Sequence, residues 1–377
     1  MIETPGFIWT VIFFLLAIGP LIFLHELGHY LVGRWCGVKA DVFSIGFGRE
    51  ITGWTDKRGT RWKVGWLPLG GYVRFAGDAN AASQPNEEWK ELLDFERNQT
   101  FHAKPLWQRA AITAAGPVAN FLVAILIFIG VLAAFGDLRT PAQVAGVQPG
   151  SAAERAGFKP GDRVVAIDGR AMDRFSDIGH YVELRAGEAM SFEVERGGAT
   201  LRILGTPAED RLVDRFGNVI KRGLMGISSG PPVLVKLPAV ELPGAAVRLT
   251  GAVLQSMVDG LVQIVTGRRS MSELGGPLMI AKYSGQTATL GWVAFLGFVA
   301  MISINLGFIN LLPIPMLDGG HLFFYAIEGV IRKPVPPQAQ EWAFRTGFVA
   351  LMTLMLFVTF NDLASFGLWH RLSGLIG

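Results

Sequence analysis

Apolar residues gather in four long runs that predict membrane-spanning helices. The runs cover residues 7–32, 110–135, 292–317 and 342–360. Each approaches or reaches the roughly 20 residues needed to cross a hydrocarbon layer about 30 Å thick. The second and third runs contain no charged residue, whereas the first is interrupted by Pro20 and by the polar residues of an HELGH segment. We therefore expect an α-helical polytopic membrane protein with about four transmembrane helices.

The segment between the first two runs has a different pattern. Residues 61–66 and 72–75 alternate between polar and apolar side chains on either side of Pro68, Gly70 and Gly71. Alternation of this kind around turn residues is typical of a β-hairpin. Because the hairpin is rich in aromatic residues, we expect it to be membrane-associated.

Residues 138–229 are polar and are divided into short β-branched runs by turn signals, which predicts one inserted α+β domain. Residues 244–267 show helical spacing with few charges, and we expect a helix that lies on the membrane surface or gates substrate entry. We expect the chain to be organised in four parts: membrane core 1–136, inserted domain 137–230, amphipathic linker or gating helix region 231–290 and membrane core 291–377.

Composition narrows the class of protein. Half of the residues are hydrophobic and 17% are charged, which fits a membrane core that carries one polar domain. The formal charge of +3 is spread along the chain, so a nucleic-acid partner is not expected. Cys36 is the only cysteine, which excludes an internal disulfide and a multi-cysteine metal site.

The HELGH segment suggests a metal site. His25 and His29 are four residues apart, so on a helix both imidazoles project from one face and can bind one Zn²⁺. Glu26 is then free to act as a general base towards water. The alternative is a polar flank just beyond the membrane boundary, but ionisable residues in an apolar helix are costly and usually have a function.

A catalytic zinc needs a third protein ligand. Asp318 follows an uncharged run directly, after Pro313 and Pro315, which interrupt the helix there. Irregular backbone at membrane depth is tolerated where it is buried in protein or lines a wet cavity. Asp318 could instead cap the next helix, and His321 could compete as the ligand or support the site indirectly.

Five motifs in order along the chain resemble the site-2 protease family of intramembrane metalloproteases, in particular the bacterial regulator of sigma-E protease branch. The motifs are HELGH at 25–29, FSIGFG at 43–48, PLGGYVRFAGD at 68–78, FHAKPLWQRAAITAAGPVANF at 101–121 and NLLPIPMLDGGH at 310–321. The resemblance implies His25, His29 and Asp318 as zinc ligands and Glu26 as the general base.

The same resemblance implies residues that bind substrate. Asn310 is expected to hold the substrate strand, and the β-loop that contains Gly70, Gly71 and Tyr72 is expected to pair with an unwound substrate. Asn120 is expected to contribute to substrate or transition-state binding, with hydrogen bonding between helices as its alternative.

Residues 147–169 resemble a PDZ domain, a module that captures an extended peptide or a protein terminus. Together these features predict a zinc metalloendopeptidase of regulated intramembrane proteolysis. Its expected substrates are single-span membrane proteins, such as an anti-sigma factor after a first cleavage, or remnant signal peptides. We expect the transmembrane helices to be in contact with membrane lipid. The expected location is the bacterial inner membrane, with a periplasmic PDZ domain and an active site near the cytoplasmic side.

Two other functions fit the sequence less well. A catalytically inactive membrane PDZ adaptor would not need Glu26 beside a complete ligand set. A metal transporter with the same ligands would usually show internal repeats, and none is visible in this sequence.

Overall fold

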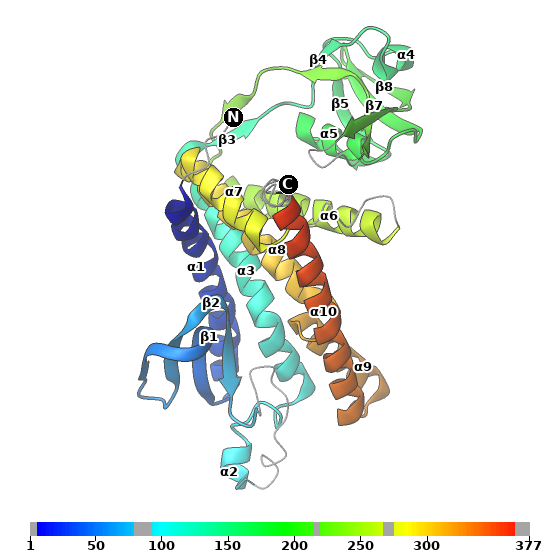
Figure 1. The fold of residues 1–377 in the computed structure, drawn as a ribbon. Helices are drawn as coiled ribbons and strands as arrows, with labels where there is room; N and C mark the ends of the chain where they lie inside the picture. Colours follow the sequence, from blue (N-terminus) through cyan, green and yellow to red (C-terminus); the bar gives the residue numbers. More distant parts are fainter. Residues whose placement is uncertain (1–5, 79–91, 214–218, 267–274, 366–377) are drawn as a thin grey trace, which may run out of the picture. The chain divides into compact units, whose positions relative to one another are not determined.

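The computed structural model describes residues 6–78, 92–213, 219–266 and 275–365 (Figure 1). The chain divides into two compact units. The helical unit takes its residues from 1–131, 243–262 and 270–377, and the β-rich unit from 132–242 and 263–269.

Long apolar helices build the helical unit. Its helices are α1 Phe7–Trp35, α2 Asp94–Arg97, α3 Leu106–Phe135, α6 Leu242–Val265, α7 Pro277–Thr289, α8 Trp292–Leu311, α9 Asp318–Ile331 and α10 Pro337–Ser365. The four predicted spans correspond to α1, α3, α8 and α10, and all four are long and apolar enough to cross a membrane. The predicted polytopic helical fold is therefore confirmed.

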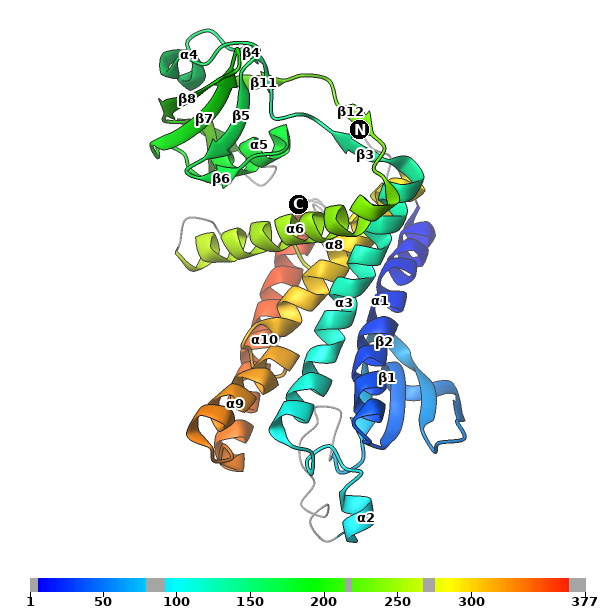
Figure 2. The same cartoon turned by 180° about the vertical axis from the view of Figure 1, so that it is seen from behind.

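Residues 239–265, which include α6, also meet the length and composition of a span, with the lowest mean hydropathy of the five candidates at 1.2. However, α6 lies across α3 and α8 in both views (Figures 1 and 2). Its side chains at Val253, Leu254 and Met257 pack against small and branched residues of α3 and α8. The expected surface or gating helix stays a prediction, because α6 is also long and apolar enough to cross a membrane.

Two strands, β1 Ala40–Thr55 and β2 Arg61–Phe75, form an antiparallel pair beside α1. The prediction that residues 61–66 pair with residues 72–75 is wrong. Both runs pair with β1, from opposite sides: Phe43 is opposite Val73 on one side and opposite Trp62 on the other. The segment 40–45 of β1 pairs along both of its edges and therefore lies between the two halves of β2. Residues 71–75 form one outer edge of the sheet.

The β-rich unit surrounds one apolar core. Its strands are β3 Asp137–Arg139, β4 Val144–Val147, β5 Arg163–Ile167, β6 Arg170–Ala171, β7 Met190–Arg196, β8 Ala199–Gly205, β9 Ala208–Val213, β10 Val219–Leu224, β11 Ile227–Ser229 and β12 Val233–Val235, and its helices are α4 Ala152–Ala156 and α5 Phe175–Glu183. The main sheet has the order β6-β5-β7-β8, and smaller pairs join β4 to β11 and β3 to β12. Val164, Phe192 and Ile178 are fully or almost fully buried between this sheet and α5.

Candidate metal centre

Helix α1 presents two histidines on one face. One helical turn separates His25 from His29, and the two Nε2 atoms lie 3.2 Å apart. His25 is only 8% exposed. The predicted ligand spacing at i and i+4 is therefore realised on a continuous helix.

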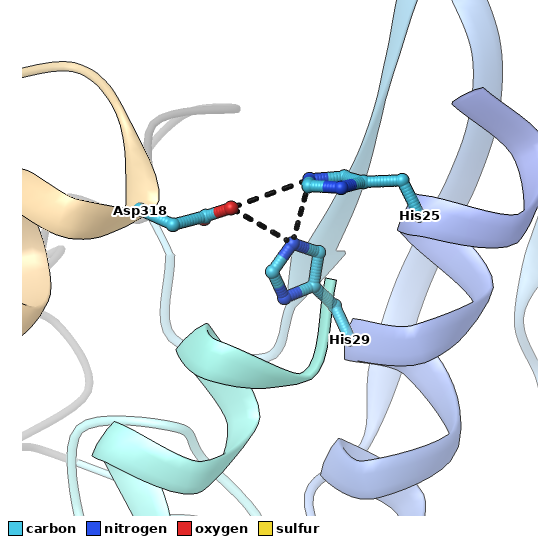
Figure 3. A group of neighbouring side chains, drawn as sticks. All are labelled: His25, His29 and Asp318. Atoms are coloured by element: carbon cyan, nitrogen blue, oxygen red, sulfur yellow. Dashed lines mark hydrogen bonds and ion pairs between the residues drawn. The ribbon is translucent and has the colours of Figure 1, made fainter. Parts of the chain in front are cut away.

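Asp318, the first residue of α9, completes the group (Figure 3). Its Oδ2 atom lies 3.2 Å from Nε2 of His25 and 3.5 Å from Nε2 of His29. The irregular segment 312–317 carries it there, and Met316 in that segment has a φ of 83°, a left-handed conformation that favours glycine. Three residues from two distant parts of the sequence thus converge on one point.

The two glycines after Asp318 permit this approach. A Cβ on Gly319 would lie 2.2 Å from the carbonyl oxygen of Leu312, and a Cβ on Gly320 would lie 2.4 Å from that of Ile314. These contacts are with backbone, which cannot move aside easily. The sequence Asp-Gly-Gly is therefore required for α9 to fold back against the turn.

The donor set fits a tetrahedral metal ion. The ligand atoms of His25, His29 and Asp318 all lie within 4.8 Å of one another. Zinc bonds of about 2.0–2.2 Å at tetrahedral angles place neighbouring ligand atoms about 3.3 Å apart, close to the three distances observed. Oδ2 of Asp318 is buried, and within the described part of the chain it has no hydrogen-bond partner. A cation between these atoms would satisfy it.

Helix α3 forms the wall behind both histidines. His29 Nδ1 lies 2.8 Å from the carbonyl oxygen of Ile112, and His25 Nδ1 lies 3.0 Å from Nδ2 of Asn120. Between these two contacts, a Cβ on Gly116 would lie 2.2 Å from Nε2 of His29. Ile112 and Gly116 were not among the residues predicted for the site from the sequence. The run of small residues in AAGPVAN was the available signal, because small residues allow helices to approach closely.

Glu26 contacts the edge strand of the β-sheet. A Cβ on Gly71 would lie 2.9 Å from Cγ of Glu26. The edge formed by residues 71–75 therefore passes directly beside the predicted general base.

The remaining residues predicted for the site contact other side chains and backbone groups of the helical unit. Gly70 packs on the ring of Phe47, and Tyr72 stacks on the same ring at 6.0 Å. The Asn310 amide donates to the carbonyl oxygen of Leu306 in its own helix at 3.0 Å. His321 is outside the ligand group, and its ring packs against Phe344 at 4.9 Å.

Comparison with known proteins decides the family. The model of peptidase family M50 matches residues 13–354. The chain belongs to peptidase family M50. A protein of Agrobacterium fabrum named "Putative zinc metalloprotease Atu1380" is 45% identical, over 93% of this chain and 95% of its own length. Metalloprotease MmpA of Caulobacter vibrioides is 37% identical, over 98% of this chain and 99% of its own length.

This M50 chain is accordingly a multi-pass membrane zinc metalloprotease of the site-2 protease family, with Zn²⁺ as its cofactor. A solved PDZ domain of the SdrC-like protein from Listeria monocytogenes matches 25% of this chain and 90% of that domain, at 17% identity and a TM-score of 0.19. A TM-score this low does not establish a shared fold, so the PDZ assignment stays a prediction from the resemblance of residues 147–169.

Proposed function

We propose that this M50 protein cleaves single-span membrane proteins within or near their transmembrane segments, with His25, His29 and Asp318 as zinc ligands and Glu26 as the general base. The convergence of the three ligand atoms at 3.2–3.5 Å supports this assignment above all other observations. Three protein ligands leave a fourth position open, which is the arrangement of catalytic rather than structural zinc sites.

His25, His29 and Asp318 would hold the zinc, which would supply Lewis-acid polarisation of the scissile carbonyl and would make water a stronger acid. Glu26 accepts the proton of the attacking water and then delivers it to the leaving nitrogen. Since Glu26 and His25 are neighbours on α1, base and ligand share one rigid support.

The substrate must unwind before it can be cut, because a helical amide is hidden by its own hydrogen bonds. In our proposal the exposed segment pairs with the edge strand at residues 71–75, which supplies backbone hydrogen bonds in the manner of strand addition. Gly71 keeps this edge close to Glu26, and Gly70 and Tyr72 flank it. Asn310 would satisfy a backbone group that unwinding frees.

The proposed substrates are anti-sigma-factor-like proteins after a first cleavage, or remnant signal peptides. The β-rich unit would capture a peptide or protein terminus as a PDZ domain does. In this proposal the enzyme lies in the inner membrane, surrounded by lipid, with the β-rich unit in the periplasm and the metal centre towards the cytoplasmic side. Basic residues such as Arg332 and Lys333 in the connection between α9 and α10 support this orientation.

The decisive experiment is a Glu26→Gln variant. We expect it to keep its zinc and its fold but to lose cleavage, so that single-span substrates accumulate uncleaved and co-purify with it. Mass spectrometry of membranes from cells with wild-type or variant enzyme identifies those proteins. If Glu26→Gln cleaves as well as wild type, or if no single-span protein accumulates, the protease assignment fails and the inactive adaptor becomes the better account.

The edge strand has its own test. In a Glu26→Gln, Cys36→Ser background, Tyr72→Cys should form disulfide cross-links with cysteines placed near the cleavage point of a trapped substrate. The matched control is Thr52→Cys, which lies in the strand segment at the opposite edge of the same sheet. Equal cross-linking at both positions would contradict pairing at residues 71–75.

A further inference from the structure

The two histidines of the metal centre are each held from behind through Nδ1. The carbonyl oxygen of Ile112 lies 2.8 Å from Nδ1 of His29, and the side-chain amide of Asn120 lies 3.0 Å from Nδ1 of His25. Both of these groups are on α3. Ile112, Gly116 and Asn120 recur every four residues, so they lie along one stripe of that helix, facing α1.

The required proton positions follow from the ligand geometry. Both Nε2 atoms face Asp318, so a metal bound there is bound by Nε2, which then carries no proton. A neutral imidazole has one N–H group, which must therefore be at Nδ1. For His29 the carbonyl oxygen of Ile112 accepts this proton in a hydrogen bond. His25 needs an acceptor at the position where Asn120 lies.

Asn120 can provide that acceptor. The oxygen and nitrogen of an amide are nearly the same size, and their assignment follows from the hydrogen bonds they make. With the amide oxygen turned towards His25, Nδ1–H donates to Asn120 and Nε2 is left free for the metal. With the amide nitrogen turned towards His25, Nε2 would keep the proton and could not bind zinc.

The surroundings of Asn120 support a built contact. The residue is fully buried, and its backbone carbonyl accepts a 2.7 Å hydrogen bond from the Ser303 hydroxyl, which ties α3 to α8. The Oδ1 atom as placed has no hydrogen-bond partner among the described residues. The only side-chain bond of this buried amide in that part of the chain is thus the one to His25.

From this geometry we infer that Asn120 is a positioning residue that fixes the Nδ1–H tautomer and the ring orientation of His25. The inference rests on the proposed ligand set and assigns Asn120 a role towards the metal centre. The contact with His25 is a hydrogen bond between helices, which was the alternative expected from the sequence, and the inference gives that bond a role towards the metal centre instead of towards the substrate. Supporting hydrogen bonds of this kind typically change metal affinity by about 10–100-fold.

Zinc affinity, measured by competition with a chromophoric chelator on the purified full-length protein, tests this role separately from cleavage. We expect Asn120→Ala and Asn120→Leu to weaken zinc binding by about 10–100-fold. Asn120→Asp should bind zinc at least as tightly as wild type, because a carboxylate also accepts the Nδ1 proton. If Asn120 only packed against its neighbours, Asn120→Asp would not keep the zinc affinity that Asn120→Ala loses.

Ser303→Ala is the matched control, since it removes the bond to the Asn120 backbone and leaves the side-chain amide unchanged. We expect it to retain wild-type zinc affinity. If Ser303→Ala weakens zinc binding as much as Asn120→Ala, or if Asn120→Asp is as weak as Asn120→Ala, the positioning role is wrong. Should Asn120→Leu fail to fold, the comparison of Ala with Asp still decides.

Two results separate this inference from the proposed function. If Asn120→Ala keeps full zinc affinity but loses cleavage, Asn120 acts on the substrate, and the positioning role is overturned while the protease assignment stands. If His25→Ala also keeps full zinc affinity, the ligand set itself is wrong, and the inference falls with it.

Discussion

The carboxylates of Asp162, in the β-rich unit, and of Asp318, in the helical unit, are both buried but differ in their hydrogen-bond partners. Asp162 is fully buried and receives two hydrogen bonds from Arg196, at 2.6 and 2.7 Å, and one from the backbone amide of Lys159. Oδ2 of Asp318 is also shielded from solvent, but among the described residues it has no hydrogen-bond partner and faces the Nε2 atoms of His25 and His29.

This difference separates structural from functional polar groups. A buried charge is tolerated when its partners are complete, and Asp162 has them within its own unit. The environment of Asp318 is complete only with a bound cation, and the neighbouring histidines determine which cation fits.

Gly116→Ala should have the largest effect. Its new Cβ would lie 2.2 Å from Nε2 of His29 and 2.8 Å from Cε1 of His25, so at least one ligand must leave its position. We expect loss of stoichiometric zinc, measured by elemental analysis of the purified protein, together with loss of cleavage. Gly130→Ala, at an open position of the same helix, is the control and should keep both. Full zinc content in Gly116→Ala would show that α3 does not confine the histidines.

Zinc removal should destabilise the helical unit alone. At free zinc of about 1,000 times its dissociation constant, bound metal stabilises the folded state by about 4 kcal/mol. Hydrogen-exchange mass spectrometry with and without a chelator should therefore show faster exchange in peptides from α1 and α9. Peptides from β5 and β7 should be unchanged. Equal acceleration in both units would contradict a metal site confined to the helical unit.

Asp318→Asn should weaken zinc binding by on the order of 100-fold, because a neutral amide replaces the anionic ligand, and the similar shape should preserve the fold. Chelator competition measures the change. His321→Ala is the informative comparison, since His321 was the competing candidate for the third ligand. A large loss of zinc affinity in His321→Ala with none in Asp318→Asn would reverse the assignment.

Asp162→Asn should have the smallest effect, confined to the β-rich unit. Burial alone would raise the pKa of Asp162, but the hydrogen bonds from Arg196 and Lys159 outweigh it and lower the pKa below its usual value. The wild-type unit should therefore be stabilised above the unfolded-state pKa of about 3.9 and lose this contribution as the pH falls through the lower folded-state pKa. The Asn variant should show less of this acid dependence and be about 2 kcal/mol less stable at neutral pH.

Urea titration with pulsed hydrogen exchange, read on peptides from β5 and β7 at several pH values, measures this difference. Asp173→Asn removes the same charge at an exposed position and should leave the stability unchanged. A pH profile of Asp162→Asn that matches wild type would mean that Asp162 does not contribute through its charge.

Much of the helical unit could be predicted from the sequence because its signals are local. The ends of α1 and α3 follow from apolar runs, and the break after α8 follows from Pro313 and Pro315. The pairing of β2 could not be predicted in the same way. Both of its halves alternate, and alternation alone does not tell whether a strand pairs with its neighbour in sequence or with a third segment.

The available chemistry can be read from the sequence alone: two histidines one helical turn apart, a glutamate between them, and an aspartate followed by two glycines. Spacing within a helix is fixed by backbone geometry, so His25 and His29 needed no tertiary information. Only the tertiary structure brought Asp318 to 3.2 Å from His25 and placed Asn120 and Ile112 behind the imidazoles. Those contacts join helices far apart in the chain, and side-chain packing between helices, which no local pattern encodes, decides which groups meet.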